Sequence, residues 1–448
     1  MPEAYDLVVI GSGTAAQVAS ARVREAGWTV AVIDQLPFGG TCALRGCDPK
    51  KMLVSGEEAL DAIRRMRGHG VEGDARIAWP ELMAFKRGFT DPLPGKQERR
   101  HAGRGVATLH GVARFTGPDT VAVGGRDLRA GHVLIATGGR PAPLGVPGEE
   151  HVVTSDAFLE RDALPRRIVF IGGGYIAAEF SHLAARVGAE VTVLQRGTRM
   201  LPRFDADLVG WLMESFAALG IEVRTGTTVT QVEQAADGFL VHATADAQPL
   251  RVAADLVVHA AGRIPALDAL DLAAAGVGVT QGKLALNAFL QSASNPRIYA
   301  AGDAAGRGPP LTPVSGHDAR VVAGNLLNGN RHRPDYRGVP SVAFTLPPIA
   351  SVGLHEEEAR AEGLRVRVKS EKVPNWFTAR RLAEPVYGYK TLVEEGSGRI
   401  LGTHLVGPGV DEVINVFALA LRHGLTAADL KAAMFAYPTG ASDIGSML

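Results

Sequence analysis

The sequence predicts an α/β protein that contains one strand–turn–helix–strand unit twice and ends in an α+β module. Residues 6–34 align with residues 167–195 at a constant offset of 161, which places Gly11 on Gly172 and Gly13 on Gly174. In each copy a β-branched run precedes the glycines, and a run of helix formers and a second apolar strand follow. This order is typical of Rossmann-like dinucleotide-binding domains.

Length and composition narrow the class of protein further. At ~100–200 residues per domain, 448 residues predict two to four domains. Equal numbers of basic and acidic residues, 47 each, exclude a global basic field for nucleic acid or anionic lipid. The sequence has neither a run of ~18 apolar residues nor a signal-peptide pattern at its start, so we expect a cytoplasmic protein. The 13 histidines are scattered, and we therefore predict no metal site.

Each copy carries a Gly-x-Gly-x-x-Ala turn directly before its helix. Small residues let the backbone approach a pyrophosphate, and the helix N-terminus offers unpaired N–H groups to it. One such turn could be a simple tight connection between strand and helix. Two turns with the same flanking elements indicate two dinucleotide sites.

The residue that closes the second strand of each copy meets the ribose and so selects the nucleotide. Asp34 in the first copy can accept hydrogen bonds from a ribose hydroxyl pair, which suits FAD or NAD. The second copy has Gln195 and Arg196 there, with Arg199 and Arg203 close by. A cationic cluster favours a 2′-phosphate, so we predict NADPH. The alternative is that Arg199 and Arg203 belong to a solvated loop.

The two cysteines, Cys42 and Cys47, lie in one hexapeptide. Residues five apart in an ideal helix are separated by about 7.5 Å of rise, beyond the ~7 Å between Cα atoms that a disulfide tolerates. A bridge here requires a distorted turn, which Gly46 permits. A pair that opens and closes beside a flavin is a two-electron relay, and the alternative is two idle buried cysteines.

Charges around the cysteines act in opposite directions. Arg45, Lys50, Lys51 and a helix N-terminus favour thiolates, whereas Asp48 opposes them.

Six further motifs extend this pattern along the chain: GGTC-x4-C-x-PKK, ATG, GGGYIAAE, AAGRIP, YAAGD and LTPV. Together they resemble the FAD-dependent pyridine nucleotide-disulfide oxidoreductases, the family of glutathione reductase, dihydrolipoamide dehydrogenase and mercuric reductase. The resemblance implies a first FAD-binding part at residues 1–148, an NAD(P)H-binding domain at 149–265, an FAD-binding return segment at 266–335 and a dimerisation domain at 336–448. It also implies a homodimer.

The resemblance implies roles for individual residues as well. Cys42 would be the interchange thiol that faces the acceptor, and Cys47 the thiol beside the flavin. Glu179 would pair with Lys50 or Lys51 near the flavin. The repeat agrees with a functional Glu179, because the first copy has Val18 at the same position.

The resemblance extends to the two cofactor sites. Tyr175 would cover the flavin until nicotinamide displaces it, and Asp303 would meet the ribityl or phosphate region of FAD. The residues expected to bind the two cofactors are Gly11, Gly13, Ala16, Asp34, Gly40, Thr41, Lys51, Val112, Ala136, Thr137, Gly138, Asp303, Thr312, Gly172, Gly174, Tyr175, Ile176, Gln195, Arg196, Arg199, Gly262 and Arg263.

The C-terminal segment departs from the family pattern. The disulfide reductases have a His, and five residues later a Glu, that protonate the leaving thiolate across the dimer. This chain has Tyr437 and Ser442 there, with Asp443 as a possible displaced acid. Phenols titrate near ~10 and imidazoles near ~6.5, so a tyrosine is a poor substitute for proton delivery at neutral pH. Tyr437 is therefore either catalytic or an interface packing residue.

Three functions remain open for the chain. The first is a reductase of small disulfides with an altered acid, similar to glutathione reductase or dihydrolipoamide dehydrogenase. The second is a reductase of thiophilic metal ions, because a tyrosine at this position resembles mercuric reductase, although the extra cysteines of that enzyme are absent. The third is a flavin-binding protein without turnover.

Overall fold

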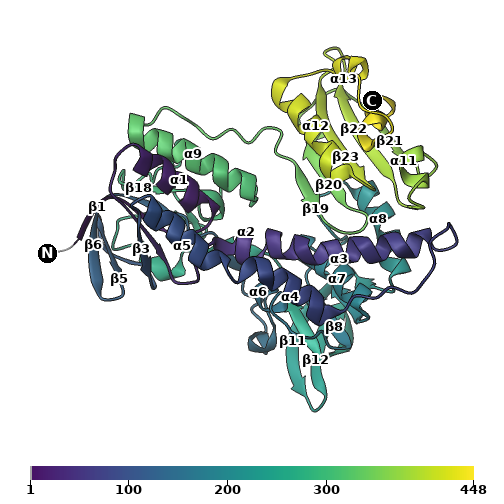
Figure 1. Cartoon of the computed structure of the whole chain (residues 1–448), viewed down its shortest axis with the longest axis horizontal. Helices are drawn as coiled ribbons and strands as arrows, with labels where there is room; N and C mark the ends of the chain where they lie inside the picture. The colour runs from purple at the N-terminus through teal and green to yellow at the C-terminus, as the bar shows by residue number, and fades with distance from the viewer. Residues whose placement is uncertain (1–2) are drawn as a thin grey trace. The chain divides into compact units, whose positions relative to one another are not determined.

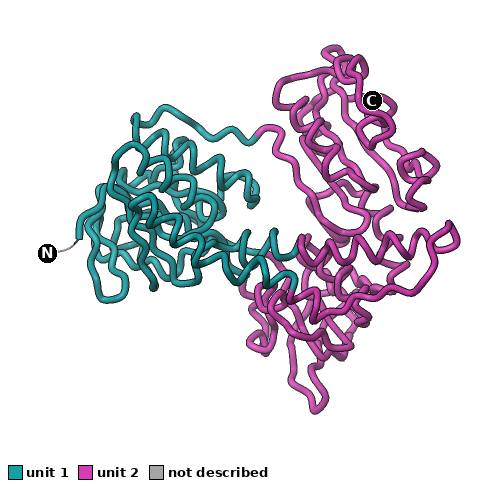
Figure 2. The backbone as a smooth tube through the Cα atoms, in the orientation of Figure 1, with its two compact units in different colours: residues 1–50, 85–142, 263–336 teal, residues 51–84, 143–262, 337–448 magenta. Residues whose placement is uncertain are grey.

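The computed structural model describes residues 3–448, which divide into two compact units (Figure 2). The first unit comprises residues 1–50, 85–142 and 263–336. The second comprises residues 51–84, 143–262 and 337–448. None of the helices within residues 3–448 is long and apolar enough to cross a membrane.

The first unit is built on a sheet of seven strands. Its strands are β1 (Glu3–Ile10), β2 (Val30–Asp34), β3 (Ala107–His110), β4 (Arg114–Gly117), β5 (Thr120–Val123), β6 (Arg126–Ile135) and β18 (Ile298–Ala300). The order is β3-β2-β1-β6-β5-β4, and β18 also pairs with β6. Pairing is parallel from β3 to β6 and at β18, while β4 and β5 are antiparallel. Residues 7–10 of β1 are buried on both faces, as a covered parallel sheet requires.

Two helices from distant parts of the sequence lie side by side in this unit (Figure 1). They are α1 (Thr14–Glu25), which follows the first glycine turn, and α9 (Thr312–Asn328). Ala16 and Ala19 of α1 are fully buried, because small side chains allow close packing at this position.

A helix break separates the two cysteines, as their spacing required. α2 (Gly40–Arg45) ends before Gly46, and α3 (Cys47–Met66) begins after it. α4 (Trp79–Thr90) and α5 (Leu93–Gly103) follow along the chain. Cys47 therefore stands at the N-terminus of a long helix, where the backbone dipole favours negative charge.

The second unit repeats the strand–turn–helix–strand order. β8 (Arg167–Ile171), α7 (Tyr175–Val187) and β9 (Glu190–Leu194) match β1, α1 and β2 at the offset found in the sequence. These strands form a parallel sheet with β10 (Glu222–Arg224) and β14 (Leu256–His259), in the order β10-β9-β8-β14. A separate antiparallel sheet contains β11 (Thr227–Ala235), β12 (Gly238–Ala245) and β13 (Gln248–Ala254).

The C-terminal half of this unit is an antiparallel sheet covered by helices. Its strands are β19 (Ser341–Ala343), β20 (Ile349–Gly353), β21 (Val366–Lys372), β22 (Gly388–Glu394) and β23 (Ile400–Val406), in the order β19-β20-β23-β22-β21. α12 (Val410–His423) packs on β20 and β23, and α8 (Ala206–Ala218) contacts β20, β22 and β23. The predicted α/β class with a C-terminal α+β module is confirmed.

Short elements complete the chain: β7 (Gly139–Pro141), α6 (Ser155–Phe158), β15 (Arg263–Pro265), β16 (Val279–Thr280), β17 (Lys283–Leu284), α10 (Glu356–Ala361), α11 (Phe377–Arg380), α13 (Ala427–Ala432) and α14 (Ile444–Met447). Four 3-10 turns are η1 (Glu149–His151), η2 (Asp268–Leu270), η3 (Gly302–Ala304) and η4 (Gly440–Asp443).

Candidate active site

The two cysteines lie close together as reduced thiols at the helix break. The Thr312 hydroxyl, on the first residue of α9, donates a hydrogen bond to Cys42 Sγ at 3.0 Å and lies 3.8 Å from Cys47 Sγ. Hydrogen bonding with Cys47 and partial burial raise the pKa of the Cys42 thiol strongly, while Thr312 lowers it. Asp48 also raises this pKa, as the sequence predicted, and the predicted effect of the basic neighbours stays a prediction.

The glycine turn before α1 makes two close backbone approaches. Gly11 has φ +106°, and a Cβ atom there would lie 2.2 Å from the Ala136 carbonyl oxygen. A Cβ atom on Gly40 would lie 2.4 Å from Gly13 Cα. Glycine is thus required where the first turn meets α2, and a turn without side chains leaves its backbone N–H groups open to a pyrophosphate.

A buried hydroxyl without a partner lies beside this cradle. Thr137 Oγ1, just after β6, is buried and makes no hydrogen bond within the described chain. An orphaned buried donor of this kind is costly unless a ligand satisfies it. Both the cradle and Thr137 therefore fit a bound FAD.

Asp34 closes β2 and anchors the same turn. Its Oδ2 atom accepts hydrogen bonds from the Ser12 backbone N–H at 2.8 Å and hydroxyl at 2.6 Å, and its Oδ1 atom accepts from Leu36 N–H at 2.9 Å. A carboxylate has about four lone-pair positions, so Asp34 can still accept from a ribose hydroxyl. Sequence reasoning missed Ser12, although its place between the two glycines marks it.

Asp303 lies in η3, just after β18, and interacts electrostatically with Arg263 of β15. Burial raises the pKa of the Asp303 carboxyl, while the Arg263 guanidinium lowers it. Arg263 also donates to the Gly139 carbonyl, so both predicted cofactor residues belong to the first unit. Asp318 of α9 accepts from Gly302 N–H at 3.0 Å and thereby fixes the turn that carries Asp303.

The second glycine turn repeats the geometry of the first. Gly172 has φ +106°, and a Cβ atom there would lie 2.4 Å from the Ala260 carbonyl oxygen. The Gln195 amide donates to the Arg199 carbonyl at 3.1 Å, and the Arg199 guanidinium donates to the Pro202 carbonyl at 2.8 Å. Arg196 is exposed at the end of β9, which fits a nucleotide phosphate that arrives from solvent.

Other predicted cofactor residues lie on elements next to these two turns. Tyr175 begins α7 and is 44% exposed, whereas Val112 follows β3 and is 53% exposed. Gly138 follows β6, Gly262 follows β14, and both have positive φ. Ala16 is buried in α1, Thr41 lies in α2, Ala136 directly follows β6, Gly174 is the N-cap of α7 and Ile176 is its second residue.

Glu179 and the two candidate lysines lie on different elements. Glu179, on α7, is buried, and its Oε1 atom accepts from Phe344 N–H at 2.8 Å. Lys51 forms an ion pair with Glu58 at 2.6 Å, and its ammonium lies 4.7 Å from the centre of the Phe344 ring. Lys50 is buried in the first unit. The predicted pairing of Glu179 with one of these lysines stays a prediction.

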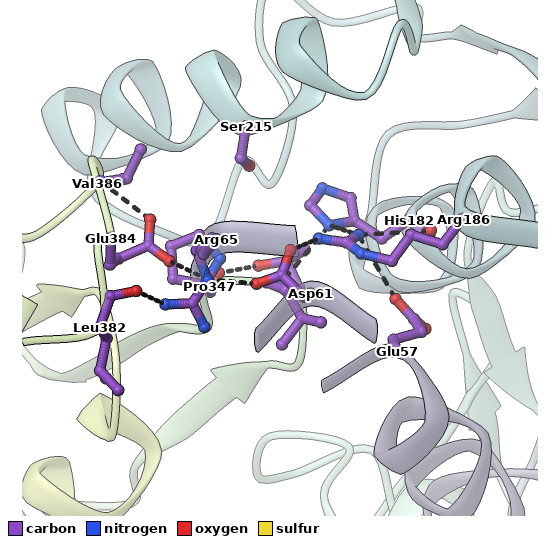
Figure 3. A network of polar contacts seen from close by, with 12 residues as sticks. Glu57, Asp61, Arg65, His182, Arg186, Ser215, Pro347, Leu382, Glu384 and Val386 are labelled. Carbon is purple, nitrogen blue, oxygen red and sulfur yellow. Dashed lines mark hydrogen bonds and ion pairs between the residues drawn. The ribbon is translucent and has the colours of Figure 1, made fainter. Parts of the chain in front are cut away.

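Arg186, two turns after Glu179 on α7, belongs to a network of buried and partly buried charged residues (Figure 3). Arg186 lies 3.6 Å from Glu57 and 2.7 Å from Asp61, both on α3. Its guanidinium also lies 3.1 Å from His182 Nδ1. Burial raises the pKa of the fully buried Glu57 carboxyl to about 8, and Arg186 opposes this shift.

The three candidate residues of the C-terminal segment have different surroundings. Tyr437 is 80% exposed, and the Ser442 hydroxyl donates to the Thr439 carbonyl at 2.5 Å as part of a turn cap. Asp443 accepts from the Thr378 hydroxyl at 2.7 Å and the Tyr387 hydroxyl at 2.9 Å. Because two hydroxyls already hold Asp443 inside the C-terminal domain, it does not fit the displaced acid.

Two of the scattered histidines gather with an acid in the second unit, whereas the prediction of no metal site stays a prediction. Ligand atoms of Asp205, His355 and His404 lie within 4.8 Å of one another. However, the two ring nitrogens of His404 lie within hydrogen-bonding distance of Ser351 and Leu354, and the Lys390 ammonium lies 3.0 Å from Asp205. The cluster is therefore a satisfied polar network in this structure.

Comparison with known proteins places the chain in a family. The model of the pyridine nucleotide-disulphide oxidoreductases matches residues 5–319, and the dimerisation-domain model of the same family matches residues 339–448. The chain belongs to this family of FAD-dependent enzymes that use NAD(P)H. It is an oxidoreductase, and the family and the enzyme class predicted from the sequence are confirmed.

Relatives of known function differ in their acceptors. A mercuric reductase of Staphylococcus aureus is 34% identical over 451 residues, which cover 98% of this chain and 81% of the relative. A glutathione reductase of Nostoc sp. is 32% identical over 464 residues and 99% of each chain.

A solved structure with similar architecture is the HOCl-induced flavoprotein disulfide reductase RclA of Escherichia coli. It has a TM-score of 0.88 and 26% identity over 99% of both chains. RclA has also been solved as a Cu(II) complex, with a TM-score of 0.88 and 27% identity over 100% of this chain and 99% of that chain.

Proposed function

We propose that the protein uses NADPH to reduce a small disulfide through FAD and the Cys42–Cys47 pair. The observation that carries this proposal is the cysteine pair itself: two neighbouring thiols at a helix N-terminus, with the Thr312 hydroxyl bonded to Cys42. Bound FAD would supply the transfer of an electron pair from reduced nicotinamide to these sulfurs.

The two glycine turns would hold the cofactors. Gly11, Gly40 and Thr137 would receive the FAD diphosphate and flavin, while Asp34 would accept from its ribose. Gly172 and Arg196 would hold NADPH, because Arg196 is an exposed cation at the end of β9 and no carboxylate stands at Gln195. We further propose a homodimer, on the support of the matched dimerisation domain.

The cysteines would then act in two exchanges. Cys42 attacks one sulfur of the acceptor disulfide, which forms a mixed disulfide and releases a thiolate. Cys47 attacks Cys42 Sγ, re-forms the internal disulfide and releases the second thiolate. Thr312 stabilises negative charge at Cys42, because its hydroxyl points at that sulfur.

Reduction of a thiophilic metal ion is the second candidate. Two adjacent thiols suit a soft cation. The mercuric reductase relative and the Cu(II) complex of RclA support it, as does the exposed Tyr437 in place of a proton donor.

A panel of acceptors tests both candidates. Steady-state oxidation of NADPH and of NADH is measured with oxidised glutathione, oxidised lipoamide, Hg(II) and Cu(II), using the parent and Cys42→Ser. We expect turnover with a disulfide, a preference for NADPH and loss of turnover in Cys42→Ser. Turnover with metal ions alone would favour the second candidate. NADPH oxidation that persists in Cys42→Ser would show that electrons pass from the flavin to the acceptor without the cysteines.

A further inference from the structure

Asp48 is a carboxylate beside the reactive sulfurs to which the proposed function gives no role. It occupies the second position of α3, directly after Cys47. Its Oδ1 atom lies 3.9 Å from Cys42 Sγ, within the range of a weak hydrogen bond donated by the thiol. Both residues belong to the first unit, so the contact lies within one compact body.

The surroundings of Cys42 and Asp48 suit proton exchange. Cys47 and Asp48 are the titratable groups that act on the Cys42 thiol, and the uncharged Thr312 hydroxyl faces it from α9. Asp48 keeps an exposed side. Partial burial nevertheless raises the pKa of its carboxyl, and the hydrogen bond from Cys42 lowers it. The carboxyl can therefore reach both the sulfur and the solvent.

The reduction of a disulfide requires a proton for each thiolate that leaves. In the C-terminal segment, Ser442 caps a turn and Asp443 is held by two hydroxyls. The Asp48 carboxylate, in contrast, already contacts the nucleophilic thiol. A general acid–base residue must come within hydrogen-bonding reach of the sulfurs between which it moves a proton, and Asp48 lies within that reach of the nucleophile.

We propose that Asp48 is the acid–base residue of this disulfide exchange, an inference that rests on the proposed function. The Asp48 carboxylate takes the Cys42 thiol proton as Sγ attacks one sulfur of the acceptor. The acceptor S–S bond breaks, a bond forms between Cys42 and the attacked sulfur, and Asp48 gives its proton to the leaving thiolate. Cys47 then gives its thiol proton to water and attacks Cys42 Sγ, and the second leaving thiolate takes a proton from water. The cysteine pair loses two electrons, and the acceptor gains them as two thiols.

A purely structural role for Asp48 is the alternative. An acidic residue in the first turn of a helix interacts favourably with the helix dipole. Such a residue supports α3 whatever the acceptor is. Its loss would slow the reactions with all disulfides by the same factor.

The test compares two acceptors whose leaving groups differ in their need for a proton. The enzyme is reduced with one equivalent of NADPH and mixed with bis(2-hydroxyethyl) disulfide, which releases a basic alkyl thiolate, or with 5,5′-dithiobis(2-nitrobenzoate), which releases a weakly basic aryl thiolate. The measured quantity is the ratio of the two single-turnover rates. We expect Asp48→Asn to lower the alkyl-to-aryl ratio at least about tenfold, since general acid–base catalysis contributes ~10²–10⁴-fold.

Two further variants make the result specific. Asp48→Glu keeps an acid and should retain most of the ratio. Asp127→Asn, at an exposed position of β6, should leave it unchanged. An equal loss of rate with both disulfides, or no loss with either, would overturn the acid–base role of Asp48 but not the proposed function. A parent enzyme that accepts electrons from NADPH but reduces neither disulfide would overturn the proposed function and this role with it.

Discussion

The two strand–turn–helix–strand copies share a backbone but differ along one face of the helix. In α1 the positions at the offset of 161 are Val18, Ala21 and Glu25; in α7 they are Glu179, His182 and Arg186. Glu25 is exposed, whereas all three residues of α7 are buried. The comparison teaches that the glycines and strands determine the backbone of the repeated unit. The residues on the helix face instead vary with the element that packs against that face.

The neighbours of each helix explain this difference. α1 packs against α9, and small or apolar side chains fill that contact. α7 faces two acidic residues of α3, the fully buried Glu57 and the partly buried Asp61, and Arg186 lies within ion-pair distance of both. A buried cation keeps its charge at low cost only when such partners surround it.

The largest effect should come from the glycines that both copies share. Gly11→Ala would drive a Cβ atom to 2.2 Å from a carbonyl, and Gly172→Ala would do so at 2.4 Å. We expect Gly11→Ala to lose flavin and Gly172→Ala to keep flavin but lose reduction by NADPH. Visible absorbance of the purified proteins and anaerobic NADPH titration measure the two properties. If both variants lose flavin, the two copies do not bind different nucleotides independently.

The next largest effect should be a difference in stability between variants of α7 and α1. Arg186→Met removes a buried cation beside Glu57 and Asp61, of which Asp61 keeps its ion pair with Arg65, so the cost should not exceed the ~3–5 kcal/mol of a broken buried ion pair. Glu25→Gln, at the same repeat position in α1, is exposed and should change stability by less than ~0.5 kcal/mol. Urea unfolding of both variants measures the difference. Equal destabilisation would mean that burial of this helix face does not distinguish the copies.

A smaller effect is expected where the second strands end. In the proposed function Arg196 binds the 2′-phosphate of NADPH, and loss of such a charge-assisted contact in Arg196→Gln costs about 1.5–3 kcal/mol, so KM for NADPH should rise roughly tenfold to a hundredfold. KM for NADH should change little. Arg251→Gln, exposed on β13, is the matched control. A parallel rise for NADPH and NADH would remove Arg196 from 2′-phosphate recognition.

Sequence reasoning reached the fold because its signals are local. The spacing of Gly11 and Gly13, repeated at Gly172 and Gly174, fixes a strand, a turn and a helix together. The distance between Cys42 and Cys47 required a helix break, and the break lies at Gly46.

What the sequence could not predict depends on contacts between distant segments. His355 and His404 are 49 positions apart, and the antiparallel sheet brings them together with Asp205. The partners of Asp443, Thr378 and Tyr387, are 65 and 56 positions away from it in the sequence. For Asp48 the sequence indicated only an acidic residue beside Cys47. Its contact with Cys42 could not be predicted, because it depends on the turn between α2 and α3.

The last prediction concerns the pH dependence that Glu57 gives to α3 and α7. Its pKa of about 8 in the folded protein lies above the ordinary value of 4.5, so between these pH values the folded state holds more protons than the unfolded state. The free energy of unfolding therefore falls as pH rises through this window. Arg186 lowers this pKa, while Glu179, Asp61 and Glu58 raise it.

Glu57→Gln should remove this contribution, because an amide does not titrate. We expect the variant to gain stability relative to the parent as pH rises through the window, by an amount on the order of a few kcal/mol. Glu58→Gln, at the adjacent and more exposed position, should follow the parent. Urea unfolding below, within and above the window gives the difference between parent and variant, from which other titrating groups cancel. A difference that does not vary with pH would mean that Glu57 stays ionised beside Arg186. The contact between α3 and α7 would then contain a permanent ion pair and not a protonated buried acid.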